Sequence, residues 1–128
     1  MNESGFEGKI PVIAPIASSE DGDTGFNVNA DLAAAAISGA LDASALIIMT
    51  DVEGIYRNWP DTDSLISEIS ASDLNALKST FADGIAPKVQ AALDAIAKGS
   101  KAVRIIDGTK PSALADALDN HGGTLVRA

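Results

Sequence analysis

Short apolar runs recur along the chain, and longer stretches that mix alanine with polar residues separate them. Residues 45–49 form a continuous apolar run bounded by polar residues, which is typical of a strand covered on both faces. Residues 102–106 predict a second buried strand, and residues 124–127 predict a final one. Residues 10–16 form an apolar run with two prolines, which predicts a short buried or edge strand. We expect these four strands to share one sheet, and the polar residues 18–25 to form a turn or hairpin loop.

The stretches between these runs carry helix signals. Asn29 is a favourable N-cap residue, and Asp31 falls in the following first turn, where a carboxylate suits the helix dipole. Residues 70–73 resemble a capping box with Asp in place of Glu, and Pro87 suits the first position of a helix. The predicted helices run over about residues 29–41, 70–79, 87–99 and 111–119.

The alternation of these strands and helices predicts the fold class. It is the βαβ pattern of a parallel sheet with helices on its faces, so we expect an α/β fold, a three-layer α/β/α domain with a mainly parallel sheet. Residues 1–9 predict a flexible start and residues 10–128 a single domain. Ligands of such sheets bind where strands end and helices begin. The loops before Asp31, after Thr50 and before Lys88 therefore become the candidate binding loops.

Composition and charge narrow the partners and the location. Hydrophobic residues make up 46% of the chain but aromatic residues only 4%, so the core must pack closely through small side chains. The formal net charge of −9 argues against nucleic acid and anionic membranes as partners, because both bind clustered Lys and Arg. The sequence has no cysteine, which excludes thiolate metal sites and cysteine nucleophiles. It also lacks a signal-peptide layout and any run near the roughly 20 apolar residues that span a bilayer, so we expect a cytoplasmic protein.

Lys88 is the most informative lysine of the chain. It follows Pro87 in the first turn of a predicted helix, where the dipole disfavours a cation by about 0.3–1 kcal/mol. A lysine beside the N–H groups of a helix N-terminus can bind phosphate. An exposed lysine tolerated at small cost accounts for the position equally well.

The other candidate residues also have ordinary structural explanations. Asp31 suits helix capping, Asn27 and Asn29 suit turns, and residues 50–54 are typical of a strand-to-loop turn in which Gly54 takes a positive φ. The chain contains neither the G-x-x-x-x-G-K-[ST] phosphate loop nor the G-x-G-x-x-G fingerprint. Taken singly, these residues do not identify a function.

Taken in chain order, several segments resemble one family, the acetylglutamate kinase branch of the amino-acid kinase superfamily. The matching segments are I-P-V-I-A-P-I (10–16), N-V-N-A-D (27–31), T-D-V-E-G-I-Y-R-N-W-P-D (50–61), G-I-A-P-K-V (84–89) and I-I-D-G (105–108). The N-V-N-A-D segment is the most specific, because kinases that act on aspartate, glutamate or UMP carry different sequences there. The resemblance covers nearly the whole chain after Lys9, and it implies the carboxy-terminal, nucleotide-binding half of such an enzyme.

The resemblance implies a role for each site residue. Asn27 and Asn29 would bind the substrate, with Asn27 holding the α-carboxylate of acetylglutamate. Asp31 would orient the catalytic lysines, and Lys88 would neutralise charge on the transferred phosphoryl group. The nucleotide would be ATP or ADP with Mg²⁺. The residues that would bind it are Thr50, Asp51, Val52, Glu53, Gly54, Ile55, Tyr56, Thr80, Phe81 and Ala82.

The implied reaction is phosphoryl transfer from ATP to the side-chain carboxylate of N-acetylglutamate, a step of arginine biosynthesis. This carboxylate is already ionised at neutral pH, so the catalyst only aligns the reactants and offsets charge. The family enzyme has a first half with a phosphate-clamping lysine followed by glycines, whereas Lys9 precedes Ile10 here. We therefore expect the chain to bind adenine nucleotide, to be inactive alone, and to take acetylglutamate only if the missing half is supplied.

Three alternatives stay open at this point. A non-catalytic nucleotide-binding or protein-interaction module would keep the fold without the chemistry. An engineered scaffold derived from an amino-acid kinase would keep the fold alone. The absence of cysteine, Ile85 where the family usually has Met, and His121-Gly122-Gly123-Thr124 where it has G-x-G-T favour the scaffold. Within the enzyme class, another amino-acid kinase is the remaining alternative.

Overall fold

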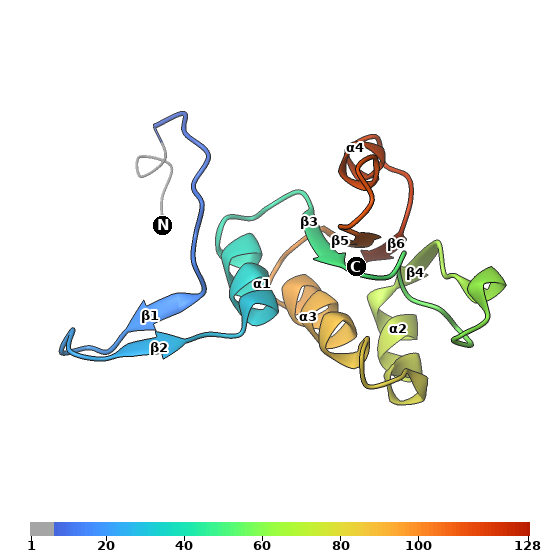
Figure 1. Ribbon diagram of the computed structural model, residues 1–128, viewed down its shortest axis with the longest axis horizontal. Coiled ribbons are helices and arrows are strands. Elements are labelled where there is room, and N and C mark those ends of the chain that lie inside the picture. Colours follow the sequence, from blue (N-terminus) through green and yellow to red (C-terminus); the bar gives the residue numbers. More distant parts are fainter. Residues whose placement is uncertain (1–6) are drawn as a thin grey trace.

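A computed structural model of the protein describes residues 7–128 (Figure 1). Of the predicted flexible start, residues 1–6 lie outside this range, and the next two residues form an exposed turn. From there the chain runs through a small projecting hairpin into the main body of the molecule (Figure 1).

The main body is built on a four-stranded sheet in the order β3-β5-β6-β4. These strands are Leu46–Thr50, Ala102–Asp107, Thr124–Arg127 and Glu68–Ser70, in the same order. β3 lies parallel to β5 and β4 lies parallel to β6, whereas β5 and β6 are antiparallel. The sheet is therefore mixed but mostly parallel, which agrees with the predicted fold class. Three of its strands are those predicted from the apolar runs.

Helices cover both faces of this sheet and complete three layers (Figure 1). α1 (Ala30–Ala40), α3 (Ala86–Ala97) and α2 (Ala71–Leu77) lie side by side on one face, and α4 (Ala113–Leu118) lies on the other. Short 3-10 turns, η2 (Thr62–Ser64) and η3 (Lys78–Thr80), lie in the connections. The predicted three-layer α/β/α arrangement is confirmed.

The predicted helix caps form as the sequence indicates. The Oδ1 atom of Asn29 accepts a hydrogen bond from the Leu32 amide at 3.1 Å, and the Oγ atom of Ser70 accepts one from the Asp73 amide at 3.1 Å. Each bond satisfies a backbone donor that the first turn of a helix leaves without a partner. The caps thus fix where α1 and α2 begin. Pro87 is the second residue of α3, one position later than predicted.

The core packs through small side chains, as the composition predicts. The alanines of α3 that face inward are fully buried, and α1 approaches α3 so closely that a Cβ atom on Gly39 would lie 2.6 Å from the Lys98 carbonyl oxygen. β5 is the most buried strand, with five of its six residues buried. Alanine and glycine at these positions allow α1 and α3 to pack closely against each other and α3 to pack over β5. The fully buried side chains of this core include Ala35, Ile55, Leu74, Ala91, Ala92, Ala95, Val103, Ile105 and Val126.

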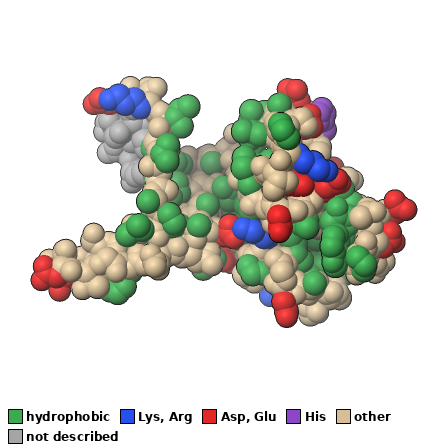
Figure 2. All heavy atoms as spheres, in the orientation of Figure 1, with side chains coloured by type: hydrophobic (Ala, Val, Ile, Leu, Met, Phe, Trp, Pro, Cys, Tyr) green, Lys and Arg blue, Asp and Glu red, His purple; other side chains and the backbone are tan. Residues whose placement is uncertain are grey.

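The prediction for residues 10–16 is wrong. Residues 10–15 form no strand, and β1 (Ile16–Ser18) pairs only with β2 (Gly25–Asn27), in an antiparallel hairpin separate from the main sheet (Figure 1). The apolar side chains of this segment are exposed, with Ile10 at 91% and Val12 at 97%, and they follow the projecting arm in Figure 2. Apolar character alone selects a strand where another layer covers it, and within the described residues Ile10 and Val12 have no such cover.

β4 is a strand that sequence reasoning missed. It has three residues, of which Ile69 alone is buried, so it contains no apolar run and is too short for its alternation to be a signal. Its place in the sheet comes from its pairing with β6 and not from its own composition. A strand this short forms because of its pairing with a neighbouring strand, and its own sequence carries little signal.

Candidate functional site

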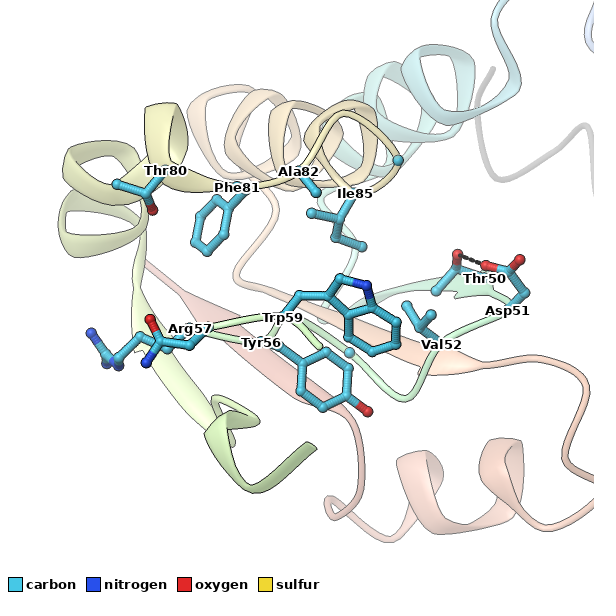
Figure 3. Close-up of a pocket in the computed structure, with 13 residues that line it drawn as sticks. Thr50, Asp51, Val52, Tyr56, Arg57, Trp59, Thr80, Phe81, Ala82 and Ile85 are labelled. Atoms are coloured by element: carbon cyan, nitrogen blue, oxygen red, sulfur yellow. Dashed lines mark hydrogen bonds between the residues drawn. The ribbon is translucent and has the colours of Figure 1, made fainter. Parts of the chain in front are cut away.

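An open cavity of about 650 Å³ lies where β3 ends, at one of the loops that the predicted topology selects (Figure 3). Its walls come from two segments of the chain that are far apart in sequence. One is the loop after β3, and the other is the connection from η3 to α3. The lining residues are Thr50, Asp51, Val52, Gly54, Tyr56, Arg57, Asn58, Trp59, Thr80, Phe81, Ala82, Gly84 and Ile85.

The polar end of the cavity is formed by the last residue of β3 and the residue after it. The Thr50 hydroxyl donates to the Asp51 carboxylate at 3.3 Å (Figure 3). Asp51 itself is exposed, so its carboxylate is open to solvent and to a ligand. A hydroxyl and an exposed carboxylate supply a donor and acceptors for a polar ligand group.

Two aromatic rings form one wall of the cavity. Tyr56 is buried, and its ring centroid lies 5.0 Å from that of Trp59 at an interplanar angle of 54°. Burial raises the pKa of the Tyr56 hydroxyl above its ordinary value, and the nearby Glu53 carboxylate raises it further. The phenol therefore stays neutral throughout the physiological pH range and remains able to donate a hydrogen bond.

The opposite wall comes from the connection between α2 and α3. Phe81 and Ile85 are half-buried, and the side chain of Ile85 points toward the indole of Trp59 (Figure 3). The hydroxyl of Thr80 donates to the Leu77 carbonyl at 2.7 Å, which holds the start of this connection against α2. The cavity is thus polar at its β3 end and apolar between these walls.

Gly54 is required for space and not for a positive φ. The glycines with positive φ in the described chain do not include it, which corrects the sequence-based expectation. A Cβ atom on Gly54 would overlap Thr124 Oγ1 and would lie 3.0 Å from the Thr124 amide nitrogen. That hydroxyl accepts from the Ile55 amide at 2.8 Å and donates to the Ile66 carbonyl at 2.6 Å. The loop after β3 is therefore fastened to β6 at its glycine.

Two of the residues predicted to bind nucleotide do not line the cavity. The side chain of Ile55 is fully buried in the core. Glu53 accepts a hydrogen bond from Lys110 Nζ and faces a neighbouring cavity of about 310 Å³. This ion pair raises the pKa of the Lys110 ammonium. Both residues hold the loop in place instead of facing its open side.

Asp31 and Lys88 form an ion pair that joins the first turns of α1 and α3. The Lys88 Nζ atom donates to Asp31 Oδ2 at 2.8 Å, and both side chains are about three-quarters buried, with exposures of 23% and 24%. Neither residue lines the cavity, although Ile85, one turn before Lys88, does. At the candidate binding loops, Asp51 and Gly54 therefore line the cavity, and the ion pair of Asp31 and Lys88 lies outside its lining.

The two asparagines predicted to bind substrate lie on the approach to α1. Asn27 is the last residue of β2 and is exposed, and Asn29 uses its side-chain oxygen to cap α1. The capping bond gives Asn29 a structural role that its position predicts. Its amide nitrogen and the whole Asn27 side chain remain open to a ligand.

Five lining residues had no role in the sequence-based prediction. Two, Gly84 and Ile85, belong to the connection before α3, and three follow Tyr56 directly. The last three are Arg57, Asn58 and Trp59. The signal that could have found them is their place in the two matching segments 50–61 and 84–89, of which only parts were assigned.

The described residues hold no group of three or more His, Cys, Asp or Glu side chains that could bind a metal ion. In the same part of the chain, no helix is long and apolar enough to cross a membrane. A Mg²⁺ ion at this cavity would need ligands from a phosphate-bearing compound, which is how proteins usually hold it.

Comparison with known proteins shows several relatives. The acetylglutamate kinase of Streptomyces clavuligerus is 43% identical over 122 residues, which are 94% of this chain and 40% of the relative. That of Clostridium acetobutylicum is 46% identical over 121 residues, 93% of this chain and 41% of the relative. The chain therefore spans about 40% of the length of these curated relatives, and it matches their C-terminal part.

Solved structures show the same fold. A crystal structure of N-acetylglutamate synthase from Neisseria gonorrhoeae, complexed with coenzyme A and L-arginine, has a TM-score of 0.83 and 28% identity, covering 94% of this chain and 28% of that one. Carbamate kinase from Giardia lamblia bound to AMP-PNP has a TM-score of 0.70 and 28% identity, covering 88% of this chain and 40% of that one. A model of the Amino acid kinase family matches residues 2–107. This chain belongs to the amino acid kinase family.

Proposed function

We propose that the cavity at the end of β3 binds an adenine nucleotide and that the chain is the ATP-binding part of an acetylglutamate kinase. The observation that carries this proposal is the meeting of two predicted segments. Residues 50–56 and 80–82, assigned to the nucleotide from sequence, contribute eight residues to one cavity. Its volume of about 650 Å³ falls within the 300–1,000 Å³ typical of small-molecule sites.

The character of the cavity supports a nucleotide as the ligand. A nucleotide has a flat apolar base at one end and a polar, anionic phosphate chain at the other. The aromatic and aliphatic walls suit the base, and the Thr50 and Asp51 end suits the polar portion. The Giardia carbamate kinase with a similar fold is bound to AMP-PNP, a nucleotide. Mg²⁺ would accompany the phosphates, because proteins usually hold it through phosphate oxygens and one or two carboxylates, and the described residues hold no group of three or more His, Cys, Asp or Glu side chains for it.

The ion pair beside the cavity suits phosphoryl transfer. Lys88 would offset charge on the transferred group, and Asp31 would hold its ammonium in position until the phosphates arrive. An acceptor such as the acetylglutamate side-chain carboxylate is ionised at neutral pH and needs no base. Asp31 is thus an organising residue, and Asn27 is the candidate for holding the acceptor.

We further propose that the chain alone does not turn over. Correct positioning of both reactants can supply about 7–11 kcal/mol of a barrier, and an open cavity with one lysine beside it cannot hold both. The chain spans about 40% of its kinase relatives, so acetylglutamate would bind only where the remaining part of such an enzyme is supplied. A non-catalytic nucleotide-binding domain is the second candidate, favoured by the pairing of Lys88 with Asp31, which leaves that ammonium already neutralised.

Calorimetry with Mg·ADP tests the binding proposal. Ile85→Glu places a carboxylate in the apolar part of the cavity, and we expect it to abolish ADP binding because a charged group there opposes burial of the base. Leu118→Glu makes the same charge change on α4, across the sheet, where 72% of the leucine is exposed, and should leave binding unchanged. An absence of any heat with the unmodified chain, or equal binding by both variants, would refute the nucleotide site.

A coupled assay with ATP, Mg²⁺ and acetylglutamate separates the two candidates. We expect no turnover from the chain alone. Turnover on adding the amino-terminal part of a related acetylglutamate kinase, lost on Lys88→Met, supports the kinase. Nucleotide binding without turnover under both conditions supports the non-catalytic domain.

A further inference from the structure

Trp59, the one tryptophan of the chain, stands on the wall of the cavity with 56% of its surface exposed. Figure 3 shows its indole between the side chain of Ile85 and the ring of Tyr56, with Val52 to one side. Tyr56 is buried and supports the indole from below, with ring centroids 5.0 Å apart. The Tyr56 ring, inclined at 54° to the indole, therefore supports it from one side, and more than half of Trp59 stays exposed at the cavity.

The loop that carries Trp59 is held by a network of hydrogen bonds. The Arg57 amide donates to the Ser64 carbonyl at 2.9 Å, and the Asp61 amide donates to the Asn58 carbonyl at 2.8 Å. The Asn58 amide also donates to the Ser64 hydroxyl at 3.0 Å, and Tyr56 pairs with Leu65 at the base of the loop. A ring placed on such a closed loop is fixed before a ligand arrives, which lowers the entropy cost of binding.

The charge of the site makes an apolar anchor necessary. The chain carries a net charge of −9, and among the described residues that line the cavity Arg57 is the one cation. Long-range attraction of an anionic ligand is therefore weak here. Stacking of a base on an aromatic ring contributes without any charge, because the contact is between two flat polarisable surfaces.

We propose that Trp59 is the base-stacking residue of this cavity, and that it holds the purine ring of the nucleotide flat against its indole with Ile85 on the opposite side. This inference rests on the proposed nucleotide site. It assigns to Trp59 the larger part of the base affinity, and it gives the chain its own reporter of binding, because all tryptophan emission comes from this position.

The test combines three measurements on the whole chain with Mg·ADP. First, the indole emission should change on titration with ADP. Second, ligand-observed NMR should show the adenine H2 and H8 signals shifting upfield, which a ring directly over the base causes. Third, calorimetry should show Trp59→Ala weakening ADP binding by roughly 5- to 100-fold, the range expected for loss of one stacked aromatic ring. Trp59→Phe should restore most of the affinity.

Matched controls make the outcomes distinct. Leu118→Ala removes an apolar side chain that is 72% exposed from α4 and should leave ADP affinity unchanged. Circular dichroism should show both variants folded, because each altered side chain is mostly exposed. If ADP binds Trp59→Ala as tightly as the unmodified chain, with no upfield shift, the stacking role is refuted while the nucleotide site stands. If the unmodified chain binds no ADP, both proposals fall together.

Discussion

The pairing of Lys88 with Asp31 explains a residue that breaks a local rule. A lysine in the first turn of a helix opposes the dipole, which disfavours a cation there by about 0.3–1 kcal/mol. The carboxylate of Asp31 in α1 lies 2.8 Å from its ammonium and offsets this cost. The same contact would keep the ammonium beside the cavity wall formed by Ile85. The ion pair with Asp31 thus accounts for the stability of Lys88 at this position and is also compatible with the proposed role of its ammonium at the phosphates.

A double-mutant cycle measures this pair. The two side chains are less than a quarter exposed, so we expect a coupling energy of about 0.5–1 kcal/mol between Asp31→Asn and Lys88→Met, at the upper end of the range for partly exposed pairs. Urea unfolding of both single variants and the double variant gives the value. The exposed pair of Lys101 and Asp42, at 4.0 Å, is the internal comparison and should show a smaller coupling. Purely additive effects at Asp31 and Lys88 would contradict a stabilising ion pair.

Asp107, at the end of β5, gives a prediction about pH. The hydroxyl and the amide of Thr109 both donate to its carboxylate, at 2.6 and 2.9 Å, and they hold the pKa of Asp107 below its ordinary 3.8. Because the folded pKa lies below the unfolded one, this stabilisation is complete above the unfolded value and is lost as pH falls through the folded value. We expect Asp107→Asn to unfold more easily than the unmodified chain at neutral pH.

The difference in free energy of unfolding between Asp107→Asn and the unmodified chain should shrink as pH falls below about 4. Urea unfolding at a series of pH values from neutral to acid measures it. Thr109→Val, which removes one donor, should behave like a weaker version of Asp107→Asn. A difference that stays constant across the series would show that the two Thr109 bonds do not favour the ionised carboxylate.

At the scale of whole elements, the sequence predicted those that carry their own local signals. Asn29 and Ser70 set the starts of α1 and α2 through capping bonds, and the apolar run at 45–49 gave β3. β4 and the displaced segment 10–15 were not predicted, because both depend on what lies beside them. Sequence signals of caps and of fully covered strands are local, whereas edge pairing is not.

The candidate site divides in the same way. The loop after β3 and residues 80–82 were predicted from the resemblance, and they do line one cavity. The sequence did not separate Glu53 and Ile55 from the residues that line the cavity. Their side chains turn away from it because the loop is fastened to Thr124 and Lys110, and these contacts are distant in sequence. Gly54 likewise was expected for its φ and is instead needed for its missing side chain.

Gly54→Ala tests the fastening of this loop to β6. The added methyl would overlap the Thr124 hydroxyl, which bridges the Ile55 amide and the Ile66 carbonyl, so the substitution should destabilise the fold by about 1–3 kcal/mol. Thermal and urea unfolding measure this change. Gly84→Ala is the matched control in the same cavity, because nothing lies within 4 Å of its added Cβ atom. Equal stability of the two alanine variants would show that the loop moves aside freely.

At the scale of the whole molecule, the projecting arm, residues 10–27, has exposed side chains and does not belong to the hydrophobic core. The arm carries Ile10 and Val12 almost fully in water, at 91% and 97% exposure, beside a shallow apolar cavity of about 380 Å³ over α1 (Figure 2). Burial of a large aliphatic side chain contributes about 1.5–3 kcal/mol where it occurs. These two side chains therefore contribute nothing of that kind to the described fold, whereas Val103 in β5, which is fully buried, does.

This contrast gives the last prediction. The double variant Ile10→Ser with Val12→Ser should change the free energy of unfolding by less than about 0.5 kcal/mol, because no contact is lost. Val103→Ser alone should cost about 3 kcal/mol, since it leaves a cavity and buries a hydroxyl. Urea unfolding at two protein concentrations measures both, and the concentration series detects association through the arm. If the double variant instead loses 2 kcal/mol or more at every concentration, the arm packs against the body of the same molecule in solution. A loss confined to high concentration would show that the apolar arm is covered by a second copy of the chain.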